Sequence, residues 1–209
     1  AEFRGRAGHA GTLPMEGRLD ALTAAAELVL EVEQLARRAA NLRATVGALT
    51  IAPGAVNVVP GRARLSIDVR HACDDVRTAA VAELTARAGA LAARRRIEFV
   101  IEQEQHLAAV PADPILSDLL GEAVAAAGHI PHRLVSGAGH DAAVMAGVAP
   151  WAMLFVRSPG GVSHGPDERV LPEDVVAALD VIVRYLDLLA GRAATSGRFP
   201  SRSDPLGAA

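Results

Sequence analysis

A histidine in a turn of small residues is the first candidate for chemistry in this sequence. The stretch GGVSHGPDE, residues 160–168, places His164 after an apolar run, and strand ends are where α/β proteins assemble their sites. Imidazole is a common zinc ligand, and its second nitrogen can be oriented by a neighbouring carboxylate such as Asp167 or Glu168. A loop histidine without a role is the alternative, because a metal site needs three or four protein ligands.

Two further polar residues lie among small and turn-forming residues. His9 occurs in AGHAGTLPM, where the glycines allow another backbone or a ligand to come close, so its imidazole could stabilise an oxyanion. Asn57 occurs in APGAVNVVPG between two Pro/Gly turns, and its amide could hydrogen-bond a substrate carbonyl. Either residue could instead be an ordinary turn residue.

Two other features could bind an anionic group. Arg70 ends an alternating strand pattern on its polar face, and a planar guanidinium is the best side-chain clamp for a carboxylate. The turn SGAGHDA, residues 136–142, brings flexible backbone N–H groups to an expected helix start, which is a natural anion site. A solvated arginine, and an Asp141 that merely caps the helix, are the alternatives.

Composition excludes several classes of partner. The chain has 209 residues, 51% of them hydrophobic but only 3% aromatic, so we expect a core of alanine, valine and leucine. A net charge of −3 argues against a nucleic-acid or anionic-membrane partner, since both need a basic field. Cys73 is the only cysteine, which leaves no disulfide framework and predicts an inert free thiol. Without an apolar leader or membrane-length run, the sequence predicts a soluble cytoplasmic protein.

The elements that must position these residues fall into two halves. In the first half, apolar periodicity predicts helices over 17–38 and 74–95. Strands are expected at 2–8, 44–55, 62–70 and 97–103. The stripe expected to be buried on the first helix consists of Leu19, Leu22, Ala26, Val29 and Ala36. The order is β-α-β-β-α-β, which matches the split βαβ or ferredoxin-like unit.

The second half has fewer strands than an independent sheet needs. Helices are expected over 114–127, from the SGAGHDA turn through AAVMAG, and over 172–189. Short strands are expected near HRLV and at WAMLFVR, 151–157. A sheet this small would have unpaired edge strands and uncovered faces. We therefore expect this half to be the end of a larger domain that begins outside the chain. Residues 191–209 lack periodicity and predict a disordered tail.

Four motifs together identify a family resemblance. The motifs are GRAGHAGTLPMEGRLDAL, NVVPGRARLSIDVRH, SGAGHDA and MLFVRSPGGVSHGPDERV. In this order and spacing they resemble the C-terminal half of the zinc-dependent N-carbamoyl-L-amino acid hydrolase and allantoate amidohydrolase family. That family belongs to the clan of dinuclear-metal aminoacylases and carboxypeptidase-like peptidases. The resemblance covers about residues 3–190, with Leu13 standing where the family usually has threonine.

The resemblance implies a fold and a set of roles. It implies an α+β, ferredoxin-like lid that dimerises, residues 1–104, followed by the C-terminal part of an α/β zinc-hydrolase domain, residues 105–190, before the 191–209 tail. The implied roles are a metal ligand at His164, catalytic contacts to the scissile carbonyl from His9 and Asn57, and substrate-carboxylate contacts from Arg70, Gly137, Gly139 and His140. The implied partners are a small ureido or amide substrate bearing a carboxylate and a second copy of the chain.

The implied reaction is hydrolysis of a linear C–N bond, with two Zn²⁺ ions (or Mn²⁺ or Co²⁺) activating a water and a glutamate moving its proton. The family's other metal ligands and its glutamate base precede the lid, so we expect the chain to be a fragment that is inactive alone. Two alternatives stay open. One is a hydrolase of N-acyl amino acids or peptides from the same clan, and the other is a non-catalytic dimerisation module.

Overall fold

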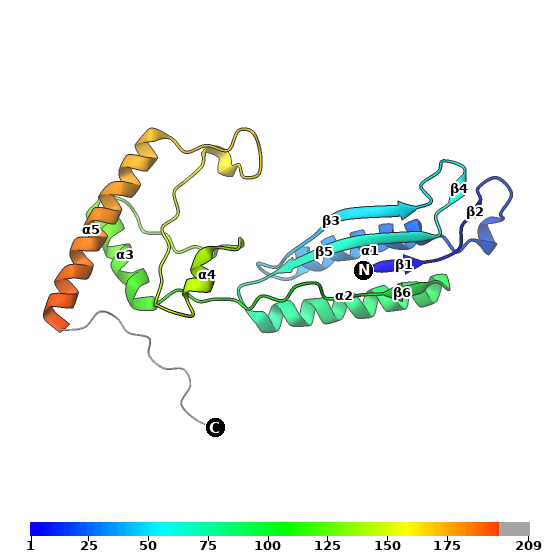
Figure 1. Ribbon diagram of the computed structural model, residues 1–209, viewed down its shortest axis with the longest axis horizontal. Helices are drawn as coiled ribbons and strands as arrows, with labels where there is room; N and C mark the ends of the chain where they lie inside the picture. The colour runs from blue at the N-terminus through cyan, green and yellow to red at the C-terminus, as the bar shows by residue number, and fades with distance from the viewer. Residues whose placement is uncertain (197–209) are drawn as a thin grey trace, which may run out of the picture. The chain divides into compact units, whose positions relative to one another are not determined.

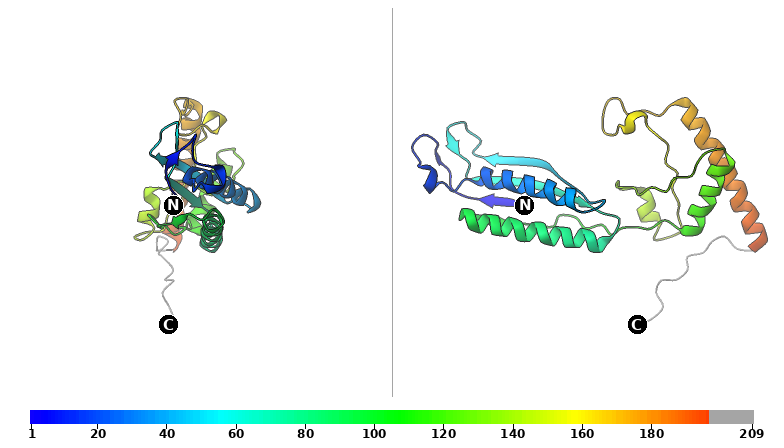
Figure 2. Two further views of the ribbon diagram at one scale, coloured as in Figure 1. Left: turned by 90° about the vertical axis from the view of Figure 1, so that its right-hand side faces the viewer. Right: turned by 180° about the vertical axis from the view of Figure 1, so that it is seen from behind.

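The computed structural model describes residues 1–196 as two compact units (Figures 1 and 2). Unit 1 covers Ala1–Ala109 and unit 2 begins at Val110. Unit 1 contains β1 (Glu2–Arg4), β2 (Gly8–His9), η1 (Met15–Gly17), α1 (Ala21–Arg38), β3 (Arg43–Ala52), β4 (Val58–Val59), β5 (Arg62–Arg70), α2 (Asp74–Arg95) and β6 (Glu98–Val100). Unit 2 contains α3 (Pro114–Ala126), α4 (Asp141–Met145), η2 (Pro159–Gly161) and α5 (Pro172–Ser196).

Unit 1 is built on an antiparallel sheet with the strand order β3-β5-β1-β6. A second, two-stranded sheet pairs β2 with β4 beyond one end of the main sheet (Figure 1). Helices α1 and α2 lie side by side and pack against the main sheet (Figure 2). The main elements therefore follow one another in the predicted order, and the chain is a mixed α/β protein.

The alternating residues of β5 divide the sheet into an apolar and a polar face. Ala63 and Leu65 are buried beneath the helices, whereas Arg62 and Arg64 are exposed on the other face. Phe3, fully buried in β1, lies in the centre of the core, with its ring centroid 5.1 Å from that of Phe99. The predicted bounds of this strand and its two faces are confirmed.

Helix α1 buries a different stripe from the one predicted. Its buried residues are Ala21, Ala24, Ala25, Leu28, Val32 and Leu35. The prediction failed because alanine fits a buried or an exposed face equally well, so the periodicity of an alanine-rich helix leaves its rotation ambiguous. The helix also begins four residues later than expected, because the Asp20 carboxylate accepts the N–H groups of Leu22 and Thr23 as an N-cap.

Unit 2 has helices where they were predicted, but neither of its predicted strands. Helices α3 and α5 pack together around Leu119, Ala123 and Val181. Residues 132–135 and 151–157 form no strand, so both strand predictions are wrong for this structure. The physical reason is that a strand needs a ladder of backbone hydrogen bonds to a neighbour. The Asp113 N–H donates to the Trp151 carbonyl oxygen at 2.8 Å, but no ladder forms on either segment within the described residues.

The C-terminal helix is longer than the sequence indicated. Helix α5 continues to Ser196, whereas we expected it to end at 189 and a disordered tail to begin at 191. The remainder of the predicted tail, 197–209, lies outside the described residues. Among the helices that the structure describes, none combines the length and apolar character needed to cross a membrane.

Candidate active site

The pairing of β2 with β4 brings His9 and Asn57 together at one tip of unit 1. His9 lies opposite Val58 in this two-stranded sheet, and the Ala10 N–H donates to the Asn57 carbonyl oxygen at 2.8 Å. Both side chains are exposed. Strands β2 and β4 lie together at one end of unit 1 (Figure 1). Two polar groups separated by 47 intervening residues thus share one exposed surface.

The His9 ring is held in one hydrogen-bonding state by its own turn. The backbone N–H of Gly11 donates to His9 Nδ1 at 3.0 Å. Because an amide N–H can only donate, Nδ1 must be the unprotonated nitrogen, and the neutral ring carries its proton on Nε2. The exposed Nε2–H is therefore available as a donor, which is what stabilisation of a developing oxyanion requires.

The glycines around His9 are explained by close backbone contacts. A Cβ on Gly5 would lie 1.9 Å from the Leu19 carbonyl oxygen, and one on Gly61 would lie 2.7 Å from the Ala7 nitrogen. Any larger residue at either position would push these segments apart. The two glycines directly beside His9 are different, because a Cβ on Gly8 or Gly11 would meet a side chain, that of Leu13 or of His9 itself. The close approach of another backbone expected beside His9 is therefore found at Gly5 and Gly61 rather than at its neighbours.

Arg70 lies at the opposite end of β5 from this tip. The strand has nine residues, so at about 3.3 Å per residue its two ends are roughly 26 Å apart. The Arg70 guanidinium binds the Asp68 carboxylate in bidentate fashion, with Nε 2.8 Å from Oδ1 and Nη2 2.6 Å from Oδ2. This hydrogen-bonded pairing lowers the pKa of Asp68 and raises that of Arg70. Both side chains line a surface depression with Arg43 and Thr45.

The glycine turn before α4 is closed by a serine. Ser136 Oγ accepts the Ala138 N–H at 3.2 Å and lies 2.6 Å from His140 Nε2. His140 is the N-cap residue of α4, but its side chain makes no capping bond. Asp141 is the first helical residue, so the alternative in which it caps α4 is wrong. A Cβ added to either Gly137 or Gly139 would meet nothing within 4 Å.

His164 lies exposed in its turn with a left-handed backbone. Its φ is 56°, a conformation that non-glycine residues rarely adopt and that often accompanies functional sites. The Glu168 carboxylate accepts the His164 backbone N–H at 2.8 Å and so closes the turn. The expected contact of Asp167 or Glu168 with the imidazole is absent from the described residues, because Glu168 is engaged by the backbone instead.

The described residues do not make up a metal site by themselves. In residues 1–196 no group of three or more histidine, cysteine, aspartate or glutamate side chains is arranged to hold an ion. His164 is one candidate ligand, whereas a catalytic zinc takes three protein ligands and a water. The chemistry that these residues can support is hydrogen-bond donation to a carbonyl and binding of a carboxylate.

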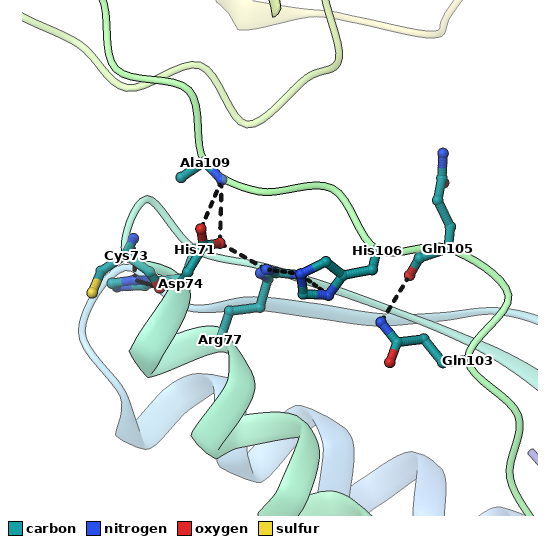
Figure 3. Close-up of polar contacts among 8 residues, drawn as sticks. All are labelled: His71, Cys73, Asp74, Arg77, Gln103, Gln105, His106 and Ala109. Carbon is teal, nitrogen blue, oxygen red and sulfur yellow. Dashed lines mark hydrogen bonds and ion pairs between the residues drawn. The ribbon is translucent and has the colours of Figure 1, made fainter. Parts of the chain in front are cut away.

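The start of α2 carries a polar cluster that sequence reasoning missed (Figure 3). Asp74 accepts the Ala109 N–H at 3.1 Å and is bonded by Arg77 Nη2 at 2.7 Å. Arg77 Nη1 also lies 3.4 Å from His106 Nδ1. These contacts lower the pKa of Asp74, Arg77 making the largest contribution. No local pattern could reveal the cluster, since 28 residues separate Arg77 from His106.

The neighbouring HAC segment is also structural. His71 Nδ1 accepts the Cys73 N–H at 2.9 Å, and His71 Nε2 lies 3.2 Å from the Ala40 carbonyl oxygen (Figure 3 shows His71 with Cys73). Cys73 is the N-cap residue of α2, and its thiol is exposed and free. His71 therefore ties the start of α2 to the α1–β3 connection.

Comparison with known proteins identifies relatives of the same kind. A sequence model described as peptidase family M20/M25/M40 matches residues 7–188. A rice protein named "Probable allantoate deiminase" is 37% identical over 214 residues, covering 88% of this chain and 44% of the relative. The N-carbamoyl-L-amino acid amidohydrolase of Geobacillus stearothermophilus is 35% identical over 178 residues, covering 85% and 44%.

A solved structure shares the fold as well. The hydantoinase/carbamoylase family amidase of Burkholderia multivorans superposes with a TM-score of 0.84 at 35% identity, covering 90% of this chain and 46% of that one. The chain thus spans a little under half the length of the proteins that it matches.

Proposed function

The chain belongs to peptidase family M20/M25/M40, and from this premise we propose that it forms part of a metal-dependent amidohydrolase. The proposed reaction is hydrolysis of the linear C–N bond of N-carbamoyl-L-amino acids or allantoate-like ureides. The names of the relatives support this substrate class over peptides, because they are allantoate deiminases and N-carbamoyl-L-amino acid amidohydrolases. Enzymes of the family are generally metal-dependent.

The observation that carries the proposal is the shared tip of β2 and β4. His9, with Nδ1 occupied by the Gly11 N–H, offers Nε2–H to the substrate carbonyl oxygen. Asn57, held beside it by the bond between its carbonyl and the Ala10 N–H, offers its side-chain amide to the same carbonyl. As the carbonyl becomes tetrahedral, negative charge grows on its oxygen and both donors bind it more tightly.

Arg70 is proposed to bind the substrate carboxylate. Its guanidinium already holds a carboxylate, that of Asp68, in the bidentate geometry that such recognition uses. Gly137, Gly139 and His140 are proposed to contact the same substrate group. The open space around the two glycines supports a close approach there.

The metal assignment rests on one residue of this chain. We propose His164 as a ligand of a pair of Zn²⁺ ions, with Mn²⁺ or Co²⁺ as alternatives. Its exposed, left-handed turn supports the assignment. Because the described residues do not complete a site, the proposal needs further ligands from outside residues 1–196.

Unit 1 is proposed to be a ferredoxin-like lid that forms a homodimer. Its sheet order and its two packed helices support the first part. Strand β3 supports the second, because this ten-residue edge strand pairs only with β5 among the described residues and exposes Leu49 and Ile51. Arg70 and His9 also lie too far apart along one lid for one small substrate to touch both, so two copies would be needed.

We also propose that the protein works in a reducing compartment, the cytoplasm. The one cysteine, Cys73, carries a free and exposed thiol, which suits the cytoplasm.

Unit 2 is proposed to be the C-terminal part of the catalytic domain. Its many exposed apolar residues, among them Leu134, Val144 and Phe155, support packing against further protein.

A segment exchange tests the proposed function. In the chimera, the matched residues of this chain replace the corresponding segment of the Geobacillus stearothermophilus amidohydrolase. We expect it to hydrolyse an N-carbamoyl-L-amino acid faster than the N-acetyl analogue or a dipeptide. Preference for either of the latter would assign a different substrate class. A folded chimera that binds metal yet hydrolyses none of the three would identify a non-catalytic dimerisation module.

A further inference from the structure

We propose that Arg18 is a positioning residue that holds His9 in its donor orientation. The inference rests on the role proposed for His9. It assigns a role to Arg18, for which the sequence analysis indicated none. It concerns the His9 loop, defined as residues 6–19 and closed by the β-bridge between Arg6 and Leu19.

The Arg18 guanidinium binds the inside of this loop. Its Nη2 donates to the Ala10 carbonyl oxygen at 2.6 Å, and its Nε and Nη2 donate to the Leu13 carbonyl oxygen at 3.2 and 3.1 Å. The side chain is partly buried rather than extended into solvent. Bonds from a charged donor are about twice as strong as neutral ones, and the planar fork fixes both carbonyls relative to each other.

Those two carbonyls flank the groups that hold His9. The Leu13 N–H donates to the His9 carbonyl oxygen at 3.0 Å, closing the turn. Between the two anchored carbonyls lies Gly11, whose N–H binds His9 Nδ1. The Ala10 carbonyl and the Gly11 N–H belong to one peptide group, so Arg18 holds the oxygen of the same peptide whose N–H binds His9 Nδ1. That N–H determines which ring nitrogen carries the proton and where Nε2–H points.

The His9 loop is tightly packed, so it cannot easily rearrange when these hydrogen bonds are lost. A Cβ on Gly8 would lie 2.9 Å from Leu13 Cδ2, and one on Gly11 would lie 3.3 Å from His9 Cε1. The turn thus packs tightly on its own side chains. A shift of Leu13 or Ala10 would be transmitted to the imidazole.

The test compares Arg18→Met and Arg18→Lys with the matched control Arg6→Met in the full chain. Arg6 lies in the same loop, but its side chain makes no hydrogen bond or ion pair with the residues that the structure describes. One readout is amide exchange at Gly11 and Leu13. The other is the pair of ¹⁵N shifts of the His9 ring, recorded in alkaline buffer where imidazoles are neutral.

In Arg18→Met we expect the Gly11 and Leu13 amides to exchange at least about tenfold faster, as loss of roughly 1.4 kcal/mol implies. The ring shifts of His9 should move from distinct acceptor and N–H values toward a tautomer average. Arg18→Lys keeps the charge but its ammonium reaches only one of the two carbonyls, so we expect amide exchange rates between those of the wild type and Arg18→Met. This variant also provides the test if Arg18→Met does not fold.

Two results would overturn the inference. The first is that the ¹⁵N shifts of the His9 ring and the amide exchange rates of the loop are the same in the Arg18 variants and the wild type. The inference would fail equally if Arg6→Met changed these quantities as much as the Arg18 variants do. The other is faster exchange throughout the core, at Leu28 and Val32 as much as in the loop, which would reduce Arg18 to a general stabilising role. Neither readout needs catalysis, so a failure of hydrolysis in the chimera is distinguishable from a failure of this inference.

Discussion

At the scale of single residues, the candidate functional residues separate into two sets by how many hydrogen bonds hold them in place. His9 has its ring nitrogen bound by Gly11, and its neighbour Ala10 is bound to Asn57. Within residues 1–196, His164 is held through its backbone N–H, which donates to Glu168. A donor to a transition state gains from such fixation, because its orientation need not be found during the reaction.

Arg70 should discriminate substrates by their carboxylate. In the chimera, Arg70→Lys should raise KM for a substrate with a free carboxylate by about 10- to 100-fold, since an ammonium cannot reproduce two parallel bonds to a carboxylate. The amide analogue of the same substrate should lose much less. Steady-state kinetics with both substrates measures the difference, with Arg43→Lys in the same surface depression as the control. Equal losses on the two substrates would contradict a carboxylate clamp.

His164 should control metal content and activity together. In the chimera, His164→Ala should lose about one metal ion per subunit, because a catalytic zinc held by three protein ligands rarely tolerates the loss of one. Elemental analysis of the purified protein gives the stoichiometry, and His129→Ala, another exposed histidine, serves as the control. Normal metal content in His164→Ala would remove it from the ligand set.

The sequence singled out candidate residues, but it did not reveal how they are arranged. The small residues beside His9 indicated a close approach of a backbone or a ligand, whereas the close backbone contacts occur at Gly5 and Gly61. The family resemblance implied only that His9 and Asn57 both contact the scissile carbonyl. Their shared tip left no signal in the sequence, because two-residue strands such as β2 and β4 have no periodic pattern. The role of Arg18 was invisible, since its partners are backbone carbonyls, which any sequence presents.

At the scale of elements, prediction succeeded where an element is stabilised by its own neighbours. Strand β5 and helix α2 begin and end where the sequence indicated, because alternation in one and the acidic start and basic end of the other are local signals. The segment 151–157 reads as a buried strand from the same kind of signal. It forms none here, because pairing is a property of two segments and no strand of the described part of the chain forms a ladder with it.

The polar face of the main sheet should make unit 1 sensitive to acid. Hydrogen bonds from Arg62 and Arg4, at 3.1 and 2.6 Å, lower the pKa of Glu2 from 4.5 to about 2. A carboxyl whose pKa is depressed by folding stabilises the fold above its unfolded value. That stabilisation is lost as the pH falls from about 4.5 toward about 2.

Urea unfolding of the chain across this pH range measures the effect. Glu2→Gln should lower the free energy of unfolding above pH 4.5 and flatten its decline at lower pH. Glu16→Gln is the control, since the Glu16 side chain makes no ion pair in the part of the chain that the structure describes. An unchanged pH slope in Glu2→Gln would contradict the assignment.

At the scale of the whole molecule, the two units differ in how much apolar surface they leave exposed. Unit 1 has a closed core around Phe3, whereas α5 of unit 2 exposes a stripe of Val176, Leu179, Val183 and Leu186. Their three- and four-residue spacing places them along one face of the helix, the pattern of a surface that packs against other protein.

The chain should therefore associate beyond a dimer. Sedimentation should show larger species whose mass grows with concentration. The double change Leu179→Lys and Val183→Lys should reduce them, because it places two charges on the stripe. The control is Leu30→Lys, at an exposed position on α1. A wild-type chain that stays no larger than a dimer at every concentration, or larger species that persist unchanged in the double variant, would contradict association through this stripe.

The proposed function depends most directly on a hydrogen bond from His9 to the scissile carbonyl. The most direct measurement is kcat and KM of the chimera on an N-carbamoyl-L-amino acid, with and without His9→Ala, using His132→Ala as the control. A donor that binds the oxygen mainly in the transition state predicts a loss in kcat of about 100- to 1,000-fold and little change in KM. An unchanged kcat, or a loss confined to KM, would contradict the claim.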